Sequence, residues 1–271
     1  MVHTAIFEDA LSLVADTKGK ALLRQSLFLA QKPTKLVAYV TAVEEYEKFI
    51  INIAGYSTEI QRILVDAFLF ALTRHGGQFY KWENDTVLPY TFHCAKTARY
   101  VQTFSEDPVA IITALWHDLL EDKRATKEEI LSLLKQYKFL QTPEKLLLSL
   151  MLLDRNQYSG ITKTRDYYSC LCSHPLALIT KTADLLANLE ACITRFNEMR
   201  HDESRFWIYA YFFEIEYCLL SQPIFLQSSY AASITKHLTF TSTTLRREFT
   251  ESEQKECITY FIERRNRGEE K

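Results

Sequence analysis

Glycine is scarce in this chain, and that scarcity limits the available folds more than any other feature of the sequence. Only 6 of the 271 residues are glycine, against a usual share of ~7%. Tight turns and β-bulges depend on glycine, because it adopts backbone angles that other residues avoid. Apolar residues also recur at three- and four-residue spacing after Ser57, as they do along an amphipathic helix. We therefore expect an all-α fold.

Capping residues mark where several of these helices begin and end. Ser57 can cap a helix that ends at Gly76-Gly77, and Asp107 followed by Pro108 begins another. Thr126 with Glu129 forms a capping-box pattern. The segment 106–122 is expected to be one helix, and the segments 78–90 and 238–245 are expected to be loops without strands. Further helices are expected at 35–54, 91–104, 142–154, 174–196, 205–220 and 253–271.

Composition excludes several classes of protein. The formal net charge is -2, so neither a nucleic acid nor an anionic membrane is an expected partner. No apolar run approaches the ~18 residues of a membrane span, and no signal peptide is recognisable. The six cysteines contain no CxxC pair and are expected to be buried free thiols in a reducing compartment. We expect a cytoplasmic protein, and delivery out of the cell by a signal-free route stays open.

The segment "HDLLEDK", residues 117–123, places one histidine and three acids directly after the apolar run "AIITALW". On a helix His117 would lie near Glu121, and Asp118 near Asp122. Two carboxylates at this spacing repel by a few tenths of a kcal/mol, and a bound cation would reverse the sign. Charges beside a core need partners, because unpaired buried charges are costly.

Two candidate partners lie on other predicted helices, His93 and Asp184. Together with His117 and Asp118 they would form a mixed nitrogen and oxygen site, which suits manganese, iron or zinc. Taken singly, each residue is ordinary: an isolated histidine is more often structural, and an isolated aspartate more often a cap or an ion-pair residue. The combination on apolar-faced helices favours a metal site.

Four segments resemble one family closely. They are "RHGGQFYK" with "LPYTFHCAKTA", "AIITALWHDLLEDKRATKEEI", "RDYYSCL" and "PLALITKTADLLANLE". Over roughly residues 58–220 the chain resembles the HD-domain metal-dependent phosphohydrolases, a family of helical bundles, and more narrowly the hydrolase domain of RelA/SpoT-type alarmone enzymes. The resemblance implies removal of 3′-pyrophosphate from a guanosine alarmone such as ppGpp or pppGpp.

The resemblance also implies roles for particular residues. The metal, typically manganese in that family, would be held by His93, His117, Asp118 and Asp184. Glu121 and Asp122 match the acid pair that orients or activates the attacking water. Lys81 and Asn188 match residues that contact the nucleotide in that family. Arg74, Arg165 and Lys181 are further candidates, because cations would stabilise the departing pyrophosphate, and Tyr80 precedes Lys81 in the same loop.

The sequence departs from the family pattern at the nucleotide-contacting loop. Tyr80 stands where the family has the arginine of an arginine-lysine pair, and the loop before Pro89 is longer. That region cradles the base, so guanine, adenine (as in ppApp) or a 2′-phosphorylated dinucleotide such as NADPH are all open. Cys94 stands where a proline usually follows the first histidine.

We expect three parts: a helical extension at 1–56, the hydrolase domain at 57–221, and a second helical extension at 222–271. The synthetase half of the long RelA/SpoT enzymes is not expected in this chain. The extensions could contact a protein partner. A nucleotide- or partner-binding module without turnover is the alternative to an enzyme, and the intact ligands and acid pair argue against it.

Overall fold

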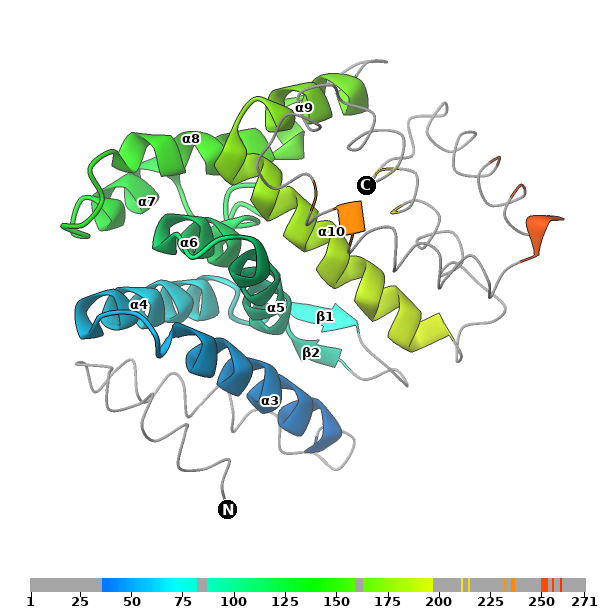
Figure 1. Ribbon diagram of the computed structural model, residues 1–271, viewed down its shortest axis with the longest axis horizontal. Helices are drawn as coiled ribbons and strands as arrows, with labels where there is room; N and C mark the ends of the chain where they lie inside the picture. The colour runs from blue at the N-terminus through cyan, green and yellow to red at the C-terminus, as the bar shows by residue number, and fades with distance from the viewer. Residues whose placement is uncertain are drawn as a thin grey trace.

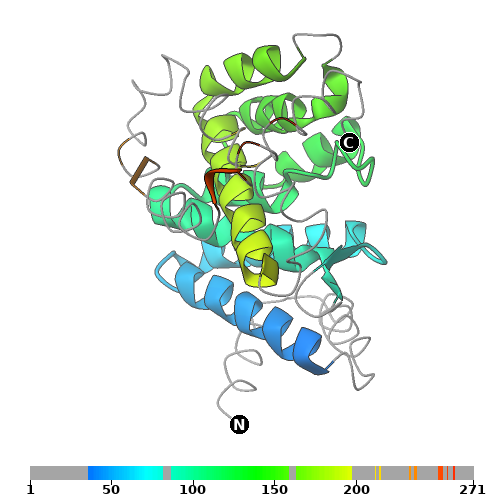
Figure 2. The same ribbon diagram turned by 90° about the vertical axis from the view of Figure 1, so that its right-hand side faces the viewer.

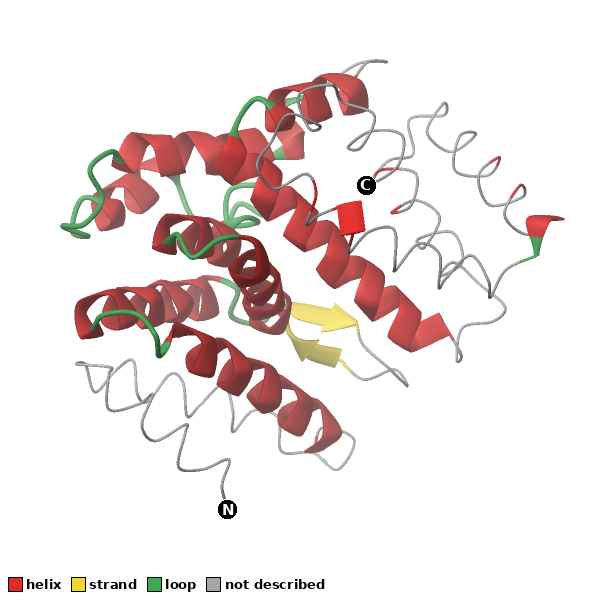
Figure 3. Ribbon diagram, viewed as in Figure 1, coloured by secondary structure: helices red, strands yellow, loops and turns green. Residues whose placement is uncertain are grey.

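In the computed structural model, the structure describes residues 36–81, 87–158 and 163–196, and isolated positions beyond them that include Tyr211 and Glu214. Helices dominate this part of the chain (Figures 1 and 3), which confirms the all-α prediction. The elements are α3 Leu36–Ile53, α4 Thr58–Arg74, β1 Phe79–Lys81, β2 Val87–Pro89, α5 Tyr90–Phe104, α6 Pro108–Trp116, α7 Lys127–Leu134, α8 Pro143–Leu153, the short 3₁₀ helix η2 Arg155–Gln157, α9 Lys163–Cys172 and α10 Pro175–Phe196. None of the described helices has the length and apolar character that crossing a membrane requires.

Side-chain caps fix three of the helix starts as the sequence predicts. The Ser57 hydroxyl accepts a hydrogen bond from the Ile60 amide, and the Asp107 carboxylate accepts one from Val109 at 2.9 Å. Thr126 and Glu129 form a reciprocal capping box. These contacts satisfy amides that have no partner within the helix. Thr142 precedes α8 without a side-chain cap.

Helix α5 lies at the centre of the bundle, with α6 and α10 packed on it (Figures 1 and 2). Helix α3 packs against α5 as well, although the sequence assigned it to the N-terminal extension. The hydroxyl groups of Tyr46 and Thr91 lie 2.8 Å apart, and Arg99 donates to Glu45 at 2.5 Å. Phe49 of α3 is fully buried in the same core. Helix α3 therefore supports the helix that carries His93.

The segment predicted as loop before α5 contains a small β-hairpin, so that prediction was wrong. Strands β1 and β2 pair antiparallel, with Phe79 opposite Pro89 and Tyr80 opposite Leu88. Each strand has three residues, too few to give a period-2 pattern. Burial of Leu88 against the core anchors the pair. The hairpin fixes the direction from which the chain enters α5, and it positions Tyr80.

The helix predicted over 106–122 ends at Trp116, so its predicted end was also wrong. Residues 117–123 form turns, closed by hydrogen bonds from the amides of Arg124 and Ala125 to the carbonyl of Leu119. Lys123 adopts a φ of 55°, in the left-handed region that favours glycine. Neither glycine nor proline marks this stop, so the helix end could not be predicted from the local sequence.

Candidate metal centre and active site

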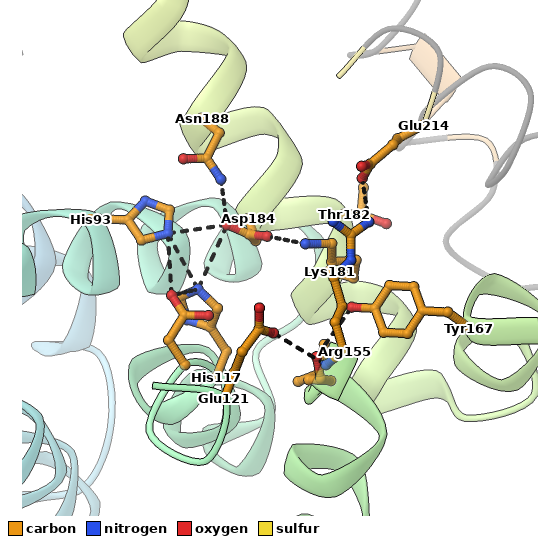
Figure 4. A network of polar contacts seen from close by, with 12 residues as sticks. His93, His117, Glu121, Arg155, Tyr167, Lys181, Thr182, Asp184, Asn188 and Glu214 are labelled. Atoms are coloured by element: carbon orange, nitrogen blue, oxygen red, sulfur yellow. Dashed lines mark hydrogen bonds and ion pairs between the residues drawn. The ribbon is translucent and has the colours of Figure 1, made fainter. Parts of the chain in front are cut away.

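Three buried side chains converge from three different segments (Figure 4). His93 comes from α5, His117 follows the last residue of α6, and Asp184 comes from α10. The two Nε2 atoms lie 3.2 Å apart, and Oδ1 of Asp184 lies 3.1 Å from Nε2 of His93 and 3.6 Å from Nε2 of His117. Their exposed fractions are 2%, 3% and 5% in that order. One ligand atom from each residue can therefore reach a single ion.

The chemistry of these donors fits a divalent cation. Nδ1 of His117 lies 2.8 Å from the carbonyl oxygen of Ala114, so it carries a proton, and Nε2 is the nitrogen that faces the cluster and can hold a proton or bind a metal. Two imidazole nitrogens and a carboxylate oxygen at these distances repel one another unless a proton or a cation lies between them. Nitrogen and oxygen donors together suit manganese, iron or zinc. The buried cluster can thus hold a metal ion, as the sequence predicts.

Asp118, the fourth predicted ligand, lies beside the other three. Its Oδ2 is 2.8 Å from Nε2 of His117 and 3.9 Å from Nε2 of His93. The Tyr90 hydroxyl donates a hydrogen bond to the same oxygen at 2.5 Å. At 18% exposure, Asp118 is the most accessible of the four side chains. It would complete the metal site on the side that solvent can reach.

The electrostatics of the cluster favour a positive charge. Burial lowers the pKa of His117, but Asp118 and Asp184 outweigh it and the pKa is raised well above its ordinary value. Burial raises the pKa of Asp184, but Lys181 and the two histidines outweigh it and lower that pKa. The carboxylates therefore stay ionised and attract either a proton or a metal cation to the imidazoles.

Two residues predicted to contact the nucleotide hold Asp184 in this structure. Lys181 pairs with its Oδ2 at 2.5 Å, and the side-chain amide of Asn188 donates to its Oδ1 at 2.7 Å. The Tyr80 hydroxyl in turn donates to Asn188 at 3.0 Å, and its ring stacks on His93 with centroids 4.9 Å apart. Tyr80 therefore supports two metal ligands from one position.

The two acids of the predicted catalytic pair face different neighbours. Oε2 of Glu121 accepts a hydrogen bond from the Arg155 backbone amide at 3.3 Å. Burial, and then Asp118, raises the pKa of Glu121 against the opposing effect of Lys181. Asp122 instead accepts from the side-chain amide of Gln78 at 2.5 Å. Glu121 is therefore the acid whose surroundings raise its pKa and favour proton uptake.

Sequence reasoning missed several residues that support the site. His75 is buried and its Nδ1 lies 2.8 Å from Oε1 of Gln78. It therefore fixes the side chain of Gln78, which in turn donates to Asp122. Burial lowers the pKa of His75 despite its Gln78 contact, which keeps its imidazole neutral. The "HGGQ" and "PY" parts of the matching segments contain His75, Gln78 and Tyr90, and they were the available signal.

For three of the residues predicted to bind substrate, the described part of the structure shows no interaction with the cluster. Arg74 forms an ion pair with Glu129 at 2.8 Å on the surface. The side chains of Lys81 and Arg165 lie outside the described residues. The roles of all three stay predictions.

Comparison with known proteins gives one informative relative. Over 91 residues the chain is 36% identical to the guanosine-3′,5′-bis(diphosphate) 3′-pyrophosphohydrolase of Aquifex aeolicus (strain VF5). The match covers 34% of this chain and 12% of the relative's length. No family model matches the chain, and no solved structure matches it. The partial match supports a relationship with hydrolases of this kind.

Proposed function

We propose that this protein is a metal-dependent phosphohydrolase that removes the 3′-pyrophosphate from a guanosine alarmone, ppGpp or pppGpp. The observation that carries the proposal is the buried convergence of His93, His117 and Asp184 next to Asp118 and Glu121. The name of the A. aeolicus relative supports the choice of substrate. Residues 57–221 are the proposed hydrolase unit, and 1–56 and 222–271 are proposed as extensions that a partner protein could contact.

In this proposal His93, His117, Asp118 and Asp184 hold the ion, manganese by the family resemblance, with iron and zinc as alternatives. A bound divalent ion lowers the pKa of a coordinated water and polarises a phosphoryl oxygen. Asp118 and Asp184 carry the charge that balances the ion. Tyr90 fixes the orientation of Asp118 through its hydroxyl.

Glu121 is proposed to accept the proton of the attacking water, because burial and Asp118 raise its pKa. Asp122, held by Gln78, is proposed to orient that water from the other side. The departing pyrophosphate carries several negative charges, so nearby cations stabilise it. Lys181, which pairs with Asp184, is one proposed contact for the pyrophosphate, and Arg74, Lys81 and Arg165 are the others. Asn188 is proposed to contact the sugar and phosphates.

The experiment is release of pyrophosphate from ppGpp with added manganese, in the wild type beside Glu121→Gln. We expect turnover by the wild type, and a loss of about 10²- to 10⁴-fold in kcat for the variant at unchanged metal content. Glu190→Gln is the matched control, since Glu190 pairs with Lys96 at 2.8 Å and makes no contact with the cluster among the described residues. A metal-loaded wild type that releases nothing from ppGpp would contradict the substrate. A normal rate in Glu121→Gln would remove Glu121 from its role.

A second candidate keeps the metal site and changes the nucleotide to ppApp or NADPH. The specific observation is Tyr80, which stacks on His93 and donates to Asn188, whereas the resembled family has an arginine there. An arginine can stack on a base and also donate to it, but the Tyr80 hydroxyl already donates to Asn188. The same assay with ppApp and NADPH distinguishes the candidates. Inactivity on all of them by protein that holds metal would favour a binding module without turnover.

A further inference from the structure

The short helix η2 holds Glu121 from two sides. The Arg155 amide donates to the Glu121 carboxylate at 3.3 Å, and the Asn156 side-chain amide donates to the Glu121 carbonyl oxygen at 3.0 Å. One bond reaches the side chain and the other reaches the backbone. The direction in which the Glu121 carboxylate points therefore depends on where residues 155 and 156 lie.

Arg155 is itself held by a residue from beyond α10. Its Nη2 pairs with Oε2 of Glu214 at 2.8 Å, and the guanidinium lies 5.0 Å from the centre of the Tyr167 ring. The Tyr168 hydroxyl donates to the same Glu214 carboxylate. Figure 4 shows the resulting chain of contacts, from Glu214 through Arg155 to Glu121.

Burial makes this connection sensitive to the charge of Glu214, which is 9% exposed. Burial raises the pKa of Glu214, but Arg155 and Lys181 outweigh it and lower that pKa, so the carboxylate is ionised. Removing one charge of a buried pair leaves the other uncompensated. A neutral residue at position 214 would thus free the Arg155 side chain to move toward solvent and shift its backbone.

We propose that Glu214 is a positioning residue for the reaction, which acts on Glu121 through Arg155. The carboxylate of Glu214 fixes the guanidinium, the guanidinium fixes the η2 turn, and the turn aims Glu121. An effect on turnover requires that Glu121 acts on the substrate, so the kinetic consequence rests on the proposed function. The structural link from Glu214 to the Arg155 amide is independent of that function.

The chain offers a control built from the same kinds of group: a glutamate carboxylate, a basic side chain and a tyrosine hydroxyl. Glu190 also joins a cation, Lys96, and a tyrosine hydroxyl, that of Tyr100. This second trio ties α5 to α10 and has no described contact with Glu121. Glu190→Gln therefore reports what loss of such a trio does to the fold alone.

The first test is hydrogen exchange at the Arg155 amide in the manganese-loaded full chain, measured by mass spectrometry with residue resolution. Glu121→Ala, which removes the acceptor, defines the full effect. We expect Glu214→Gln to raise exchange at this amide toward that value and Glu190→Gln to leave it unchanged. Unchanged exchange in Glu214→Gln overturns the proposal whatever the substrate is. If Glu214→Gln does not fold, Glu214→Asp keeps the charge on a shorter side chain, and an intermediate exchange rate is expected.

The second test is a double-mutant cycle on pyrophosphate release. We expect Glu214→Gln to lower kcat by about 10- to 100-fold, with KM and manganese affinity little changed. In the Glu121→Gln background the same substitution should change kcat by less than about twofold, because the carboxylate that Glu214 positions is already absent. Equal losses in both backgrounds would show a merely structural role and overturn the proposal. If the wild type turns over no nucleotide, the proposed function fails, and the exchange result still decides the structural link.

Discussion

The two histidines of the cluster are oriented by different means. The backbone carbonyl of Ala114 accepts from Nδ1 of His117, which is the usual outer contact of a metal-bound imidazole. Nδ1 of His93 has no hydrogen-bond partner within the described part of the chain. The face of His93 is instead covered by the stacked ring of Tyr80. At the scale of single residues, the ring of Tyr80 therefore orients His93 by stacking, where a hydrogen bond orients His117.

Replacing Tyr80 tests that role. We expect Tyr80→Ala to weaken manganese binding by about 10- to 100-fold, as is usual for loss of an outer-shell partner. Tyr80→Phe keeps the ring and should lose less. Calorimetric titration with manganese measures both, and Tyr100→Phe, whose hydroxyl contacts Glu190, is the control. Wild-type affinity in Tyr80→Ala would show that stacking does not orient His93.

The residue types in the sequence predicted the metal-binding cluster, but they did not predict the residues that support it. The histidines and aspartates stood out because several ligand-type side chains fell on apolar-faced helices. Arg155 and Glu214 did not stand out, because a charged residue in a sequence is usually a solvated one. Their contacts depend on how η2 and the chain beyond α10 meet, which no local pattern records.

At the scale of elements, α6 is the piece on which the site depends most. Its residues from Ala110 to Trp116 are all buried, so neighbouring helices fix it on every side. Trp116 is fully buried, and its Nε1 donates to the carbonyl oxygen of Ala67 in α4 at 2.8 Å. His117 follows directly, so the anchor of α6 also sets the position of a metal ligand.

Replacing Trp116 by phenylalanine should therefore affect both stability and metal binding. The lost hydrogen bond and ring volume should lower the free energy of unfolding by about 1–3 kcal/mol, and manganese affinity should fall as well. Thr126→Ala removes the α7 cap at a cost of about 1 kcal/mol and should leave affinity unchanged. Denaturant unfolding and metal titration of both variants measure this. Equal affinities in the two variants would contradict the coupling of α6 to the site.

Elements were predictable where a local signal decides them. The starts of α4, α6 and α7 follow from capping residues that act within one turn. The β-hairpin does not, because it depends on burial of Leu88 against the core. The turn after Trp116 closes locally, through hydrogen bonds to the Leu119 carbonyl, but its left-handed residue is Lys123 and not a glycine that would mark the turn in the sequence. The turn matters most, since it carries Asp118 and both acids of the proposed catalytic pair.

At the scale of the whole molecule, carboxylates paired with cations join segments that are distant in sequence. Glu190 ties α10 to α5, and Glu214 ties the chain beyond α10 to η2. Burial raises the pKa of each carboxyl, but Lys96 for Glu190 and Arg155 for Glu214 outweigh it and lower the pKa below the ordinary 4.5. Their stabilising contribution is complete above 4.5 and is lost as pH falls through the folded-state pKa.

Thermal unfolding as a function of pH measures this contribution. We expect the melting temperature of the wild type to fall on acidification below about pH 4.5. A variant with both Glu190→Gln and Glu214→Gln should start less stable at neutral pH and lose less on acidification. Parallel pH profiles for the two proteins would show that these pairs do not contribute.

The all-α class of the described residues could be predicted, because glycine is scarce throughout the sequence and apolar residues recur at helical spacing in many of its segments. The position of α3 could not be predicted from the sequence. Its packing on α5 depends on Glu45 and Tyr46, whose partners Arg99 and Thr91 lie more than forty residues further along the chain. An extension in the sequence thus shares a core with the helix that carries His93.

The measurement that tests the central claim most directly is manganese binding by calorimetry, in the wild type and in Asp184→Asn, with Glu190→Gln as the control. We predict one ion per chain for the wild type and for the control. Asp184→Asn should show at least a tenfold loss of affinity, roughly 1.4 kcal/mol or more. Absence of binding in the wild type for manganese, iron and zinc alike, or unchanged binding in Asp184→Asn, would contradict a metal centre at His93, His117 and Asp184.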